Sequence, residues 1–148
     1  MAIKTKKLLI ALPLTLLLGL VAFYHLFPET VFTLLVRADR SASSLAEHRI
    51  RVDGRQFAYL EGGKGDVLVL LHGFGANKDN WVRISRHLTP HFRVIAPDLI
   101  GFGESDLAPD NDYSMRAQVV RVRQFVHALG IKSLHLGGSS MGGYIAGV

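Results

Sequence analysis

Residues 134–146 read Leu-His-Leu-Gly-Gly-Ser-Ser-Met-Gly-Gly-Tyr-Ile-Ala and contain the pattern Gly-x-Ser-x-Gly, with Ser140 at its centre. The pattern alone occurs by chance in many proteins, so its setting decides what it means. Here a short apolar strand precedes it and a helix-compatible run follows it. A serine at a sharp turn between a strand and a helix has a strained backbone and an exposed side chain. We therefore predict that Ser140 is the nucleophile of a serine hydrolase; a purely structural glycine-rich turn is the alternative.

The glycines around Ser140 fit such a turn, in which the chain passes close to itself and tolerates only small residues. Gly138 and Gly142 lie two residues on either side of the serine. Gly143 adds room for the following helix to lie close to the strand. These three glycines are expected to support the elbow.

An acyl-transfer site also needs backbone N–H donors that point at the developing oxyanion. Met141 follows the serine at the start of the expected helix. Residues 72–75, His-Gly-Phe-Gly, come directly after the apolar run 67–71, and such a glycine-flanked loop can turn the N–H of Phe74 inward. We predict that the N–H groups of Phe74 and Met141 form the oxyanion hole.

The rest of that loop is predicted to have a supporting role. Gly73 and Gly75 give the loop its freedom to turn. His72 could be read as a general base, but a histidine that opens such a loop more often holds its shape through ring hydrogen bonds, and we favour that role.

Strands alternate with helices over the remaining sequence. Asp53-Gly54 is a strong signal for a hairpin turn, and the continuous apolar run 67–71 is typical of a strand covered on both faces. We expect a three-layer α/β sandwich with a mostly parallel sheet, an N-terminal antiparallel hairpin, and function at the carboxyl ends of the strands. The expected strands are 48–52, 56–60, 67–71, 92–96 and 133–136, and the expected helices are 78–88, 114–130 and 141–148.

Composition excludes several other classes. The chain has 148 residues, a formal net charge of +5 and no cysteine, so it has neither a disulfide framework nor a thiol nucleophile. Its basic residues are scattered except near the N-terminus, and we predict no nucleic-acid partner. Arg116, Arg121 and Arg123 share one side of the helix that follows Ser114, and we expect them to be solvated.

A long apolar segment lies near the N-terminus. From Leu8 to Phe27 twenty residues carry no formal charge, and Lys4, Lys6 and Lys7 precede them. The length is sufficient to cross a bilayer, and no small-x-small cleavage site follows. We predict that residues 1–28 are a basic cytoplasmic start and an uncleaved, single-pass signal anchor. The rest of the chain would then lie on the other side of the membrane, in the periplasm of a Gram-negative cell.

Residues 29–46 connect this segment to the domain at 47–148. Val31, Leu34, Leu35 and Ala38 recur at helical spacing, which predicts an amphipathic helix that lies either on the membrane or on the domain. Residues 41–44 are expected to form a linker.

A third motif completes a set that resembles a known family. Residues 97–105 read Pro-Asp-Leu-Ile-Gly-Phe-Gly-Glu-Ser. With the motifs at 72–75 and 138–143, in this order and at these separations, they resemble the amino-terminal half of α/β-hydrolase-fold esterases and lipases. The stretch 72–81 (HGFGANKDNW) with the apolar N-terminus more narrowly resembles bacterial membrane-associated lipases, which are similar to the monoacylglycerol lipases of animals.

The resemblance implies a mechanism and a substrate class. It implies cleavage of carboxylic esters of acyl lipids through an acyl-enzyme on Ser140, without a metal or an organic cofactor. It also implies that Asp98 and Ser105 shape their loop, and that Asp98 is not the acid of a catalytic triad.

One part of the family's pattern is missing from the sequence. In this fold the triad acid and histidine follow the serine along the chain. Only eight residues follow Ser140, none of them acidic or histidine, and all seven histidines precede it. We therefore expect a fragment or a truncated gene product with little or no esterase activity of its own.

Other functions remain open. A carbon–carbon bond hydrolase acting on dienoic diketones uses the same serine elbow, although its soluble substrates fit poorly with a membrane anchor. A non-catalytic membrane-anchored remnant is the alternative from another class. Dehalogenase and epoxide hydrolase relatives have an aspartate where Ser140 stands, which disfavours them.

Overall fold

The computed structural model describes residues 2–148, with side chains described from Pro13 onward. The chain separates into two compact units, one up to Ala38 and one from Asp39 to Val148. The first unit contains helix α1 (Ala2–Leu26) and most of helix α2 (Pro28–Ala42). Apolar side chains of both helices are exposed, among them Leu26 and Phe32.

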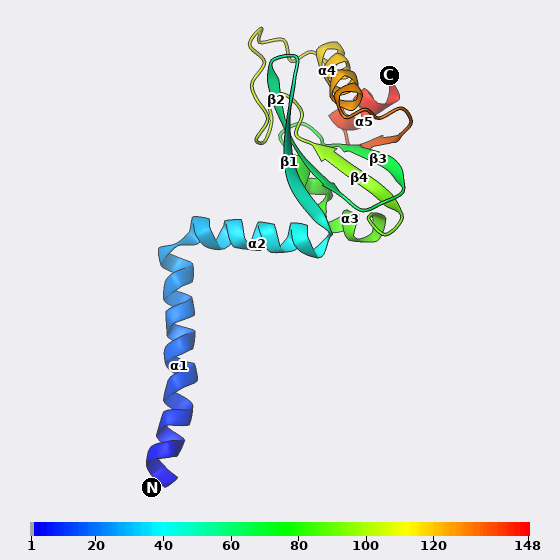
Figure 1. Ribbon diagram of the computed structural model, residues 1–148. Helices are drawn as coiled ribbons and strands as arrows, with labels where there is room; N and C mark the ends of the chain where they lie inside the picture. Colours follow the sequence, from blue (N-terminus) through cyan, green and yellow to red (C-terminus); the bar gives the residue numbers. More distant parts are fainter. Residues whose placement is uncertain (1) are drawn as a thin grey trace. The chain divides into compact units, whose positions relative to one another are not determined.

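No single helix among the described residues is long and apolar enough to cross a membrane. Residues Pro13–Leu26 and Pro28–Ala42 are long and apolar enough to cross a membrane only when they are taken together, and the two helices form a pair bent by 100° (Figure 1). For residues 8–12, the first part of the expected span, the side chains are not among those that the structure describes. The signal anchor therefore stays a prediction.

The second unit is built on one five-stranded sheet. Strands β1 and β2 pair antiparallel, β2 and β4 pair antiparallel, and β3 is parallel to both β4 and β5. The strands lie in the order β1-β2-β4-β3-β5, with bounds Leu45–Val52, Arg55–Gly62, Asp66–Leu71, Phe92–Pro97 and His135–Gly138. We expected a mostly parallel sheet with antiparallel pairing only in the N-terminal hairpin. The sheet is instead mixed, because β2 pairs antiparallel with β4 as well as with β1.

The hairpin turns where the sequence indicates. Asp53 and Gly54 have φ values of 49° and 76°. Positive φ at both central residues is the geometry of a two-residue type I′ turn, whose twist matches that of the strands it joins. The turn sets Val52 opposite Arg55.

The two faces of the sheet carry separate apolar clusters. Val69 and Leu71 of β3 face one cluster, which includes Phe125 of α4 (Met115–Ala128) and Ile145 of α5 (Met141–Gly147). Leu70 and Val94 belong to the other cluster, with Val82 of α3 (Val82–Leu88). Side chains alternate between faces along a strand, so β3 is covered on both sides, as its continuous apolar run predicts. Helices α4 and α5 lie side by side (Figure 1).

Several element boundaries differ from the sequence predictions. The helix expected over 78–88 begins as the 3-10 turn η1 (Lys78–Trp81). The last strand lies at 135–138 and not at 133–136, because its pairing with β3 continues to Leu71. Residues 41–44 form the end of α2 and a tight turn rather than a linker, and Ser43 is buried.

Helix α4 begins and ends where the sequence predicts, but one of the arginines expected to be solvated on its charged side is buried. The Ser114 hydroxyl accepts a hydrogen bond from the N–H of Ala117 (3.2 Å), and Gly130 follows the helix with a φ of 70°. Arg121, expected to be solvated, is 4% exposed and donates to the carbonyl of Asp112 (2.6 Å). The helical pattern cannot reveal this partner, because it lies in the preceding loop.

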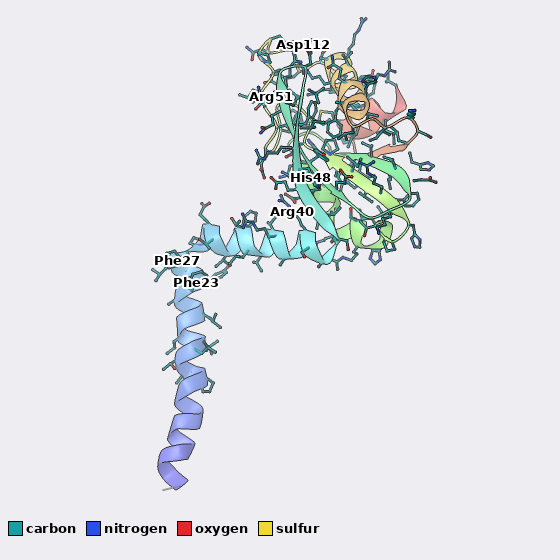
Figure 2. The ribbon with its side chains drawn as sticks, viewed as in Figure 1. Phe23, Phe27, Arg40, His48, Arg51 and Asp112 are labelled. Atoms are coloured by element: carbon teal, nitrogen blue, oxygen red, sulfur yellow. The ribbon has the colours of Figure 1, made fainter. Side chains whose placement is uncertain are left out.

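The last turn of α2 belongs to the second unit. Arg40, labelled in Figure 2, donates from Nε to Oδ1 of Asp79 (2.6 Å) and from a second nitrogen to Oδ2 (2.7 Å). This bidentate pair fixes the end of α2 to η1, the segment that follows the residue 72–75 loop.

Candidate active site

Ser140 lies at a strained turn between β5 and α5. Its φ is 51° and its ψ is −115°, in a region that residues other than glycine rarely adopt. The N–H of Ser139 donates to the carbonyl of Leu71 (3.0 Å), which ties the turn to the end of β3. The Ser140 side chain is exposed. This is the backbone geometry that a nucleophile elbow requires.

The glycines predicted to support the elbow lie where the backbone comes closest to itself. A Cβ on Gly142 would lie 2.2 Å from the carbonyl oxygen of Leu71, and one on Gly138 would lie 2.3 Å from the carbonyl carbon of Gly142. At Gly143 the nearest atom, the Gly138 oxygen, would be 3.3 Å away. Gly138 and Gly142 therefore allow α5 to start directly against the end of β3.

The His-Gly-Phe-Gly loop lies beside this elbow. The N–H of Ala76 donates to the carbonyl of Gly73 (3.2 Å), and Gly75 has a φ of 71°, which makes a type II turn with Phe74 and Gly75 at its centre. A Cβ on Gly73 would lie 3.4 Å from the Cβ of Ser140. The structure thus brings the two sequence motifs together at the carboxyl ends of β3 and β5.

The two predicted oxyanion donors are both available in this arrangement. The hydrogen bond of the turn uses the N–H of Ala76 and leaves that of Phe74 unused. Met141 is the first residue of α5, and the first N–H groups of a helix have no partner within it. Both N–H groups are therefore free to donate to a bound carbonyl oxygen.

His72 is buried and bonded to backbone on both sides of its ring. Its Nε2 lies 3.0 Å from the N–H nitrogen of Leu99, and its Nδ1 lies 2.8 Å from the carbonyl oxygen of Gly73. Nε2 must accept and Nδ1 must donate, which assigns the tautomer. Neither nitrogen is free to take a proton from Ser140, and this favours the loop-shaping role over that of a base.

The pH dependence of stability should report on His72. Burial lowers the pKa of its imidazole and outweighs the hydrogen bond to Gly73 and the charge of Asp98, which raise it. The stability that neutral His72 provides is present above its ordinary pKa of about 6.5 and is lost as the pH falls through the lowered pKa. We expect the urea midpoint to fall between about pH 7.5 and about pH 5.5, and to fall less in His72→Gln, which keeps an acceptor for Leu99 but does not titrate. Equal slopes in both proteins would contradict this prediction.

Phe74 is 82% exposed, and its ring meets that of Phe102 edge to face at 5.6 Å. Phe102 meets His72 in the same way at 5.4 Å. Phe102 belongs to the motif at 97–105, but its contacts with Phe74 and His72 were not predicted from the sequence. Its place in a Gly-Phe-Gly sequence like that at 73–75 was the one available signal.

The loop after β4 is held by Asp98, whose carboxylate is fully buried. The carboxylate accepts from the backbone N–H of Glu104 (2.9 Å) and from the backbone and side chain of Lys78. The Ser105 hydroxyl donates to the carbonyl of Asp98 (2.7 Å) and accepts from the N–H of Ala58 (3.0 Å). These contacts favour the loop-shaping role for Asp98 and Ser105. The sequence pattern predicts Lys78 at the start of a helix and does not indicate its burial, but its side chain is only 1% exposed.

Among the described residues, no histidine side chain forms a hydrogen bond with Ser140. His48, labelled on β1 in Figure 2, stacks on the ring of Tyr59 at 5.4 Å, and His135 meets Phe92 edge to face at 5.9 Å. Over the same residues no group of three or more His, Cys, Asp or Glu could hold a metal ion. Over the described residues, the candidate site comprises Ser140 and the two predicted N–H donors.

Comparison with known proteins identifies the family. A family model described as alpha/beta hydrolase fold matches residues 66–148, which is more than half of the chain. The chain belongs to the α/β-hydrolase fold family. For an α/β-hydrolase, the turn at Ser140 is the expected site of the nucleophile elbow, and the resemblance to lipases drawn from the sequence is confirmed by the relatives.

Three relatives illustrate the similarity. Lipase 1 of Psychrobacter immobilis is 40% identical over 116 residues, which cover 76% of this chain and 36% of that protein. Monoacylglycerol lipase ABHD6 of Bos taurus is 31% identical over 94% of this chain and 42% of that protein. A solved structure that resembles this chain is the crystal structure of a membrane phospholipase A, described as a novel bacterial virulence factor. Its sequence is 44% identical and its TM-score is 0.80, and the match covers 93% of this chain and 45% of that one. The chain therefore spans less than half the length of each.

Proposed function

We propose that the protein is a serine hydrolase that cleaves carboxylic esters of acyl lipids, with Ser140 as its nucleophile. The observation that carries the proposal is the positive φ of Ser140 at the junction of β5 and α5, next to the glycine loop at 73–75. Holding a serine in this strained conformation has a cost, and such strain is concentrated at functional sites. Lipases among the relatives support a lipid ester as substrate.

The proposed mechanism has two stages. Oγ of Ser140 attacks the ester carbonyl while a base takes its proton, and the N–H groups of Phe74 and Met141 bind the oxyanion. The intermediate collapses, the alcohol leaves with the proton, and an acyl-serine remains. Water then attacks the acyl-enzyme, releasing the fatty acid and regenerating the hydroxyl. No metal or organic cofactor takes part.

Among the described residues, no hydrogen bond joins the Ser140 hydroxyl to a histidine or an acidic side chain. Both ring nitrogens of His72 are engaged with backbone, and the sequence after Ser140 contains neither a histidine nor an acidic residue. Without a base the hydroxyl stays protonated and is a weak nucleophile. The chain spans less than half the length of its lipase relatives, and we infer that these residues alone have little esterase activity.

We also infer attachment to a membrane through the N-terminal segment. The apolar sequence from Leu8 to Phe27 follows three lysines, and the exposed apolar side chains of α2 include Phe32, Leu34 and Leu35. This arrangement favours a cytoplasmic N-terminus and a hydrolase domain on the extracytoplasmic side. Such an anchor would keep the site near an acyl-lipid substrate.

The test compares substrates of different chemistry. The longest gene product that contains this chain is assayed in detergent against a monoacylglycerol, p-nitrophenyl butyrate and a dienoic diketone. We expect turnover of both esters and none of the diketone, and residues 1–148 alone should turn over neither ester at a measurable rate. Turnover of the diketone alone would indicate a carbon–carbon bond hydrolase. No turnover of any of them, together with no labelling by a fluorophosphonate, would indicate a non-catalytic remnant.

A further inference from the structure

Lys78 is an unusual residue to find buried. Its side chain is 1% exposed, whereas lysines are almost never buried unless they are paired. Its ammonium donates to Oδ2 of Asp98 (2.8 Å) and to Oε1 of Glu104 (3.1 Å). Burial lowers the pKa of Lys78, but the hydrogen bonds and charges of Asp98 and Glu104 more than offset this, so the net pKa is raised. The side chain therefore remains a cation at neutral pH.

The same carboxylate also holds the main chain of Lys78. Oδ1 of Asp98 accepts from the backbone N–H of Lys78 at 2.6 Å, while Oδ2 accepts from the backbone N–H of Glu104 at 2.9 Å. Gly103 passes so close that a Cβ there would lie 2.2 Å from Cγ of Asp98. One buried carboxylate thus joins two loops that are distant in the sequence.

These contacts fasten the residue 72–78 segment at both of its ends. At the first end, Nε2 of His72 accepts from the N–H of Leu99, the residue after Asp98. At the second end, Lys78 is bonded to Asp98 itself. Phe74, the predicted oxyanion donor, lies between these two attachments. Its N–H can therefore shift only if the turn deforms or one attachment opens.

Stability alone does not account for this ion pair. Desolvation of two charges can exceed their attraction, and well-packed apolar residues often replace a buried pair without loss of stability. The carboxylate of this ion pair also accepts hydrogen bonds from the backbone of both loops, and these bonds fix the distance between the loops. Apolar residues could not fix this distance, because they form no hydrogen bonds. An oxyanion donor depends on such fixed placement, since its effect comes from being oriented before the charge develops.

We propose that Lys78 is a positioning residue for the oxyanion hole, and that its ion pair with Asp98 and Glu104 holds the Phe74 loop in its productive place beside Ser140. The inference rests on the proposed function and deepens it. Lys78 does not touch the substrate. It acts through Phe74, so its loss should slow the chemical step more than it weakens substrate binding.

The test uses the longest gene product that contains this chain and separates placement from folding. Lys78→Met leaves the buried carboxylate of Asp98 without its cation, so it should lower the melting temperature as well as the rate. Adding Asp98→Asn removes the unpaired charge but leaves one oxygen for the two backbone N–H donors of Lys78 and Glu104, so Lys78→Met with Asp98→Asn should recover part of the melting temperature that Lys78→Met loses. The kcat of this double variant should stay reduced by about 10-fold or more, with KM changed by less than about 3-fold.

Two controls match the changes. Lys132→Met removes an exposed lysine, and Arg93→Met breaks an ion pair with Glu61 (2.7 Å) on the sheet, away from the loops. Both should retain the wild-type kcat. A double variant that melts near the wild-type temperature and has the wild-type kcat would overturn the inference about Lys78 while leaving the proposed function intact. A wild-type protein without any activity that depends on Ser140 would overturn both.

Discussion

Replacing Ser140 with alanine is expected to lower kcat for ester hydrolysis by about 10⁴-fold to 10⁶-fold in the longest gene product that contains this chain. The substitution removes the atom that forms the acyl-enzyme, and the remaining N–H donors can only stabilise direct attack by water. Its effect on folding should be small, because the Ser140 side chain is exposed. The measurement is steady-state hydrolysis of p-nitrophenyl butyrate, with the melting temperature recorded for each protein.

Ser139→Ala is the matched control for this prediction. Ser139 is also exposed, and its contacts in the elbow come from its backbone N–H and carbonyl, which alanine retains. Its kcat should stay within about 3-fold of the wild type. If Ser140→Ala kept more than about a tenth of the wild-type kcat, the assignment of the nucleophile would be wrong.

Gly142→Ala should have the second largest effect. The new Cβ would lie 2.2 Å from the carbonyl oxygen of Leu71 and 2.6 Å from that of His72, and both are backbone atoms that cannot rotate away. Either α5 or the end of β3 must move, which separates Ser140 from the Phe74 loop. A displacement of about 1 Å at a catalytic site can cost about 100-fold in rate, and we expect a loss of at least that size. Overpacking should also lower stability by about 1–3 kcal/mol.

The same helix provides the control. A Cβ on Gly147 would have no atom within 4 Å, and its φ is not positive. Gly147→Ala should therefore be neutral or stabilise the helix by about 0.5–1 kcal/mol, with the kcat of the wild type. Urea unfolding and steady-state kinetics of the two variants test the pair. Equal behaviour of Gly142→Ala and Gly147→Ala would show that the close approach at the elbow does not matter.

The sequence was most informative where local geometry decides the structure. The turn at Asp53-Gly54 and the cap at Ser114 each depend on a few adjacent residues and have the backbone that those residue types favour. The elbow at Ser140 was predicted from the glycines around it, although the serine itself is in a strained conformation. The buried run 67–71 was readable for a similar reason, because a strand covered on both faces cannot alternate polar and apolar residues.

Contacts between distant segments were not readable in the same way. Lys78 and Arg121 look like solvated residues in a helical pattern, and only the fold reveals their partners at Asp98 and Asp112. The pairing of β2 with β4 likewise joins strands that other elements separate in the sequence, so the mixed sheet followed from topology and not from periodicity. The loop that carries Phe74 was found by its motif, whereas the ion pair that holds it was not.

The central claim, that Ser140 is the nucleophile, is tested most directly by mapping a covalent adduct. The longest gene product that contains this chain is treated with a fluorophosphonate and digested, and the modified peptide is sequenced by mass spectrometry. We predict one adduct, on Ser140, that does not form in Ser140→Ala and does form in Ser139→Ala. An ester-hydrolysing protein that carries its adduct on another residue, or that carries none, would contradict the account.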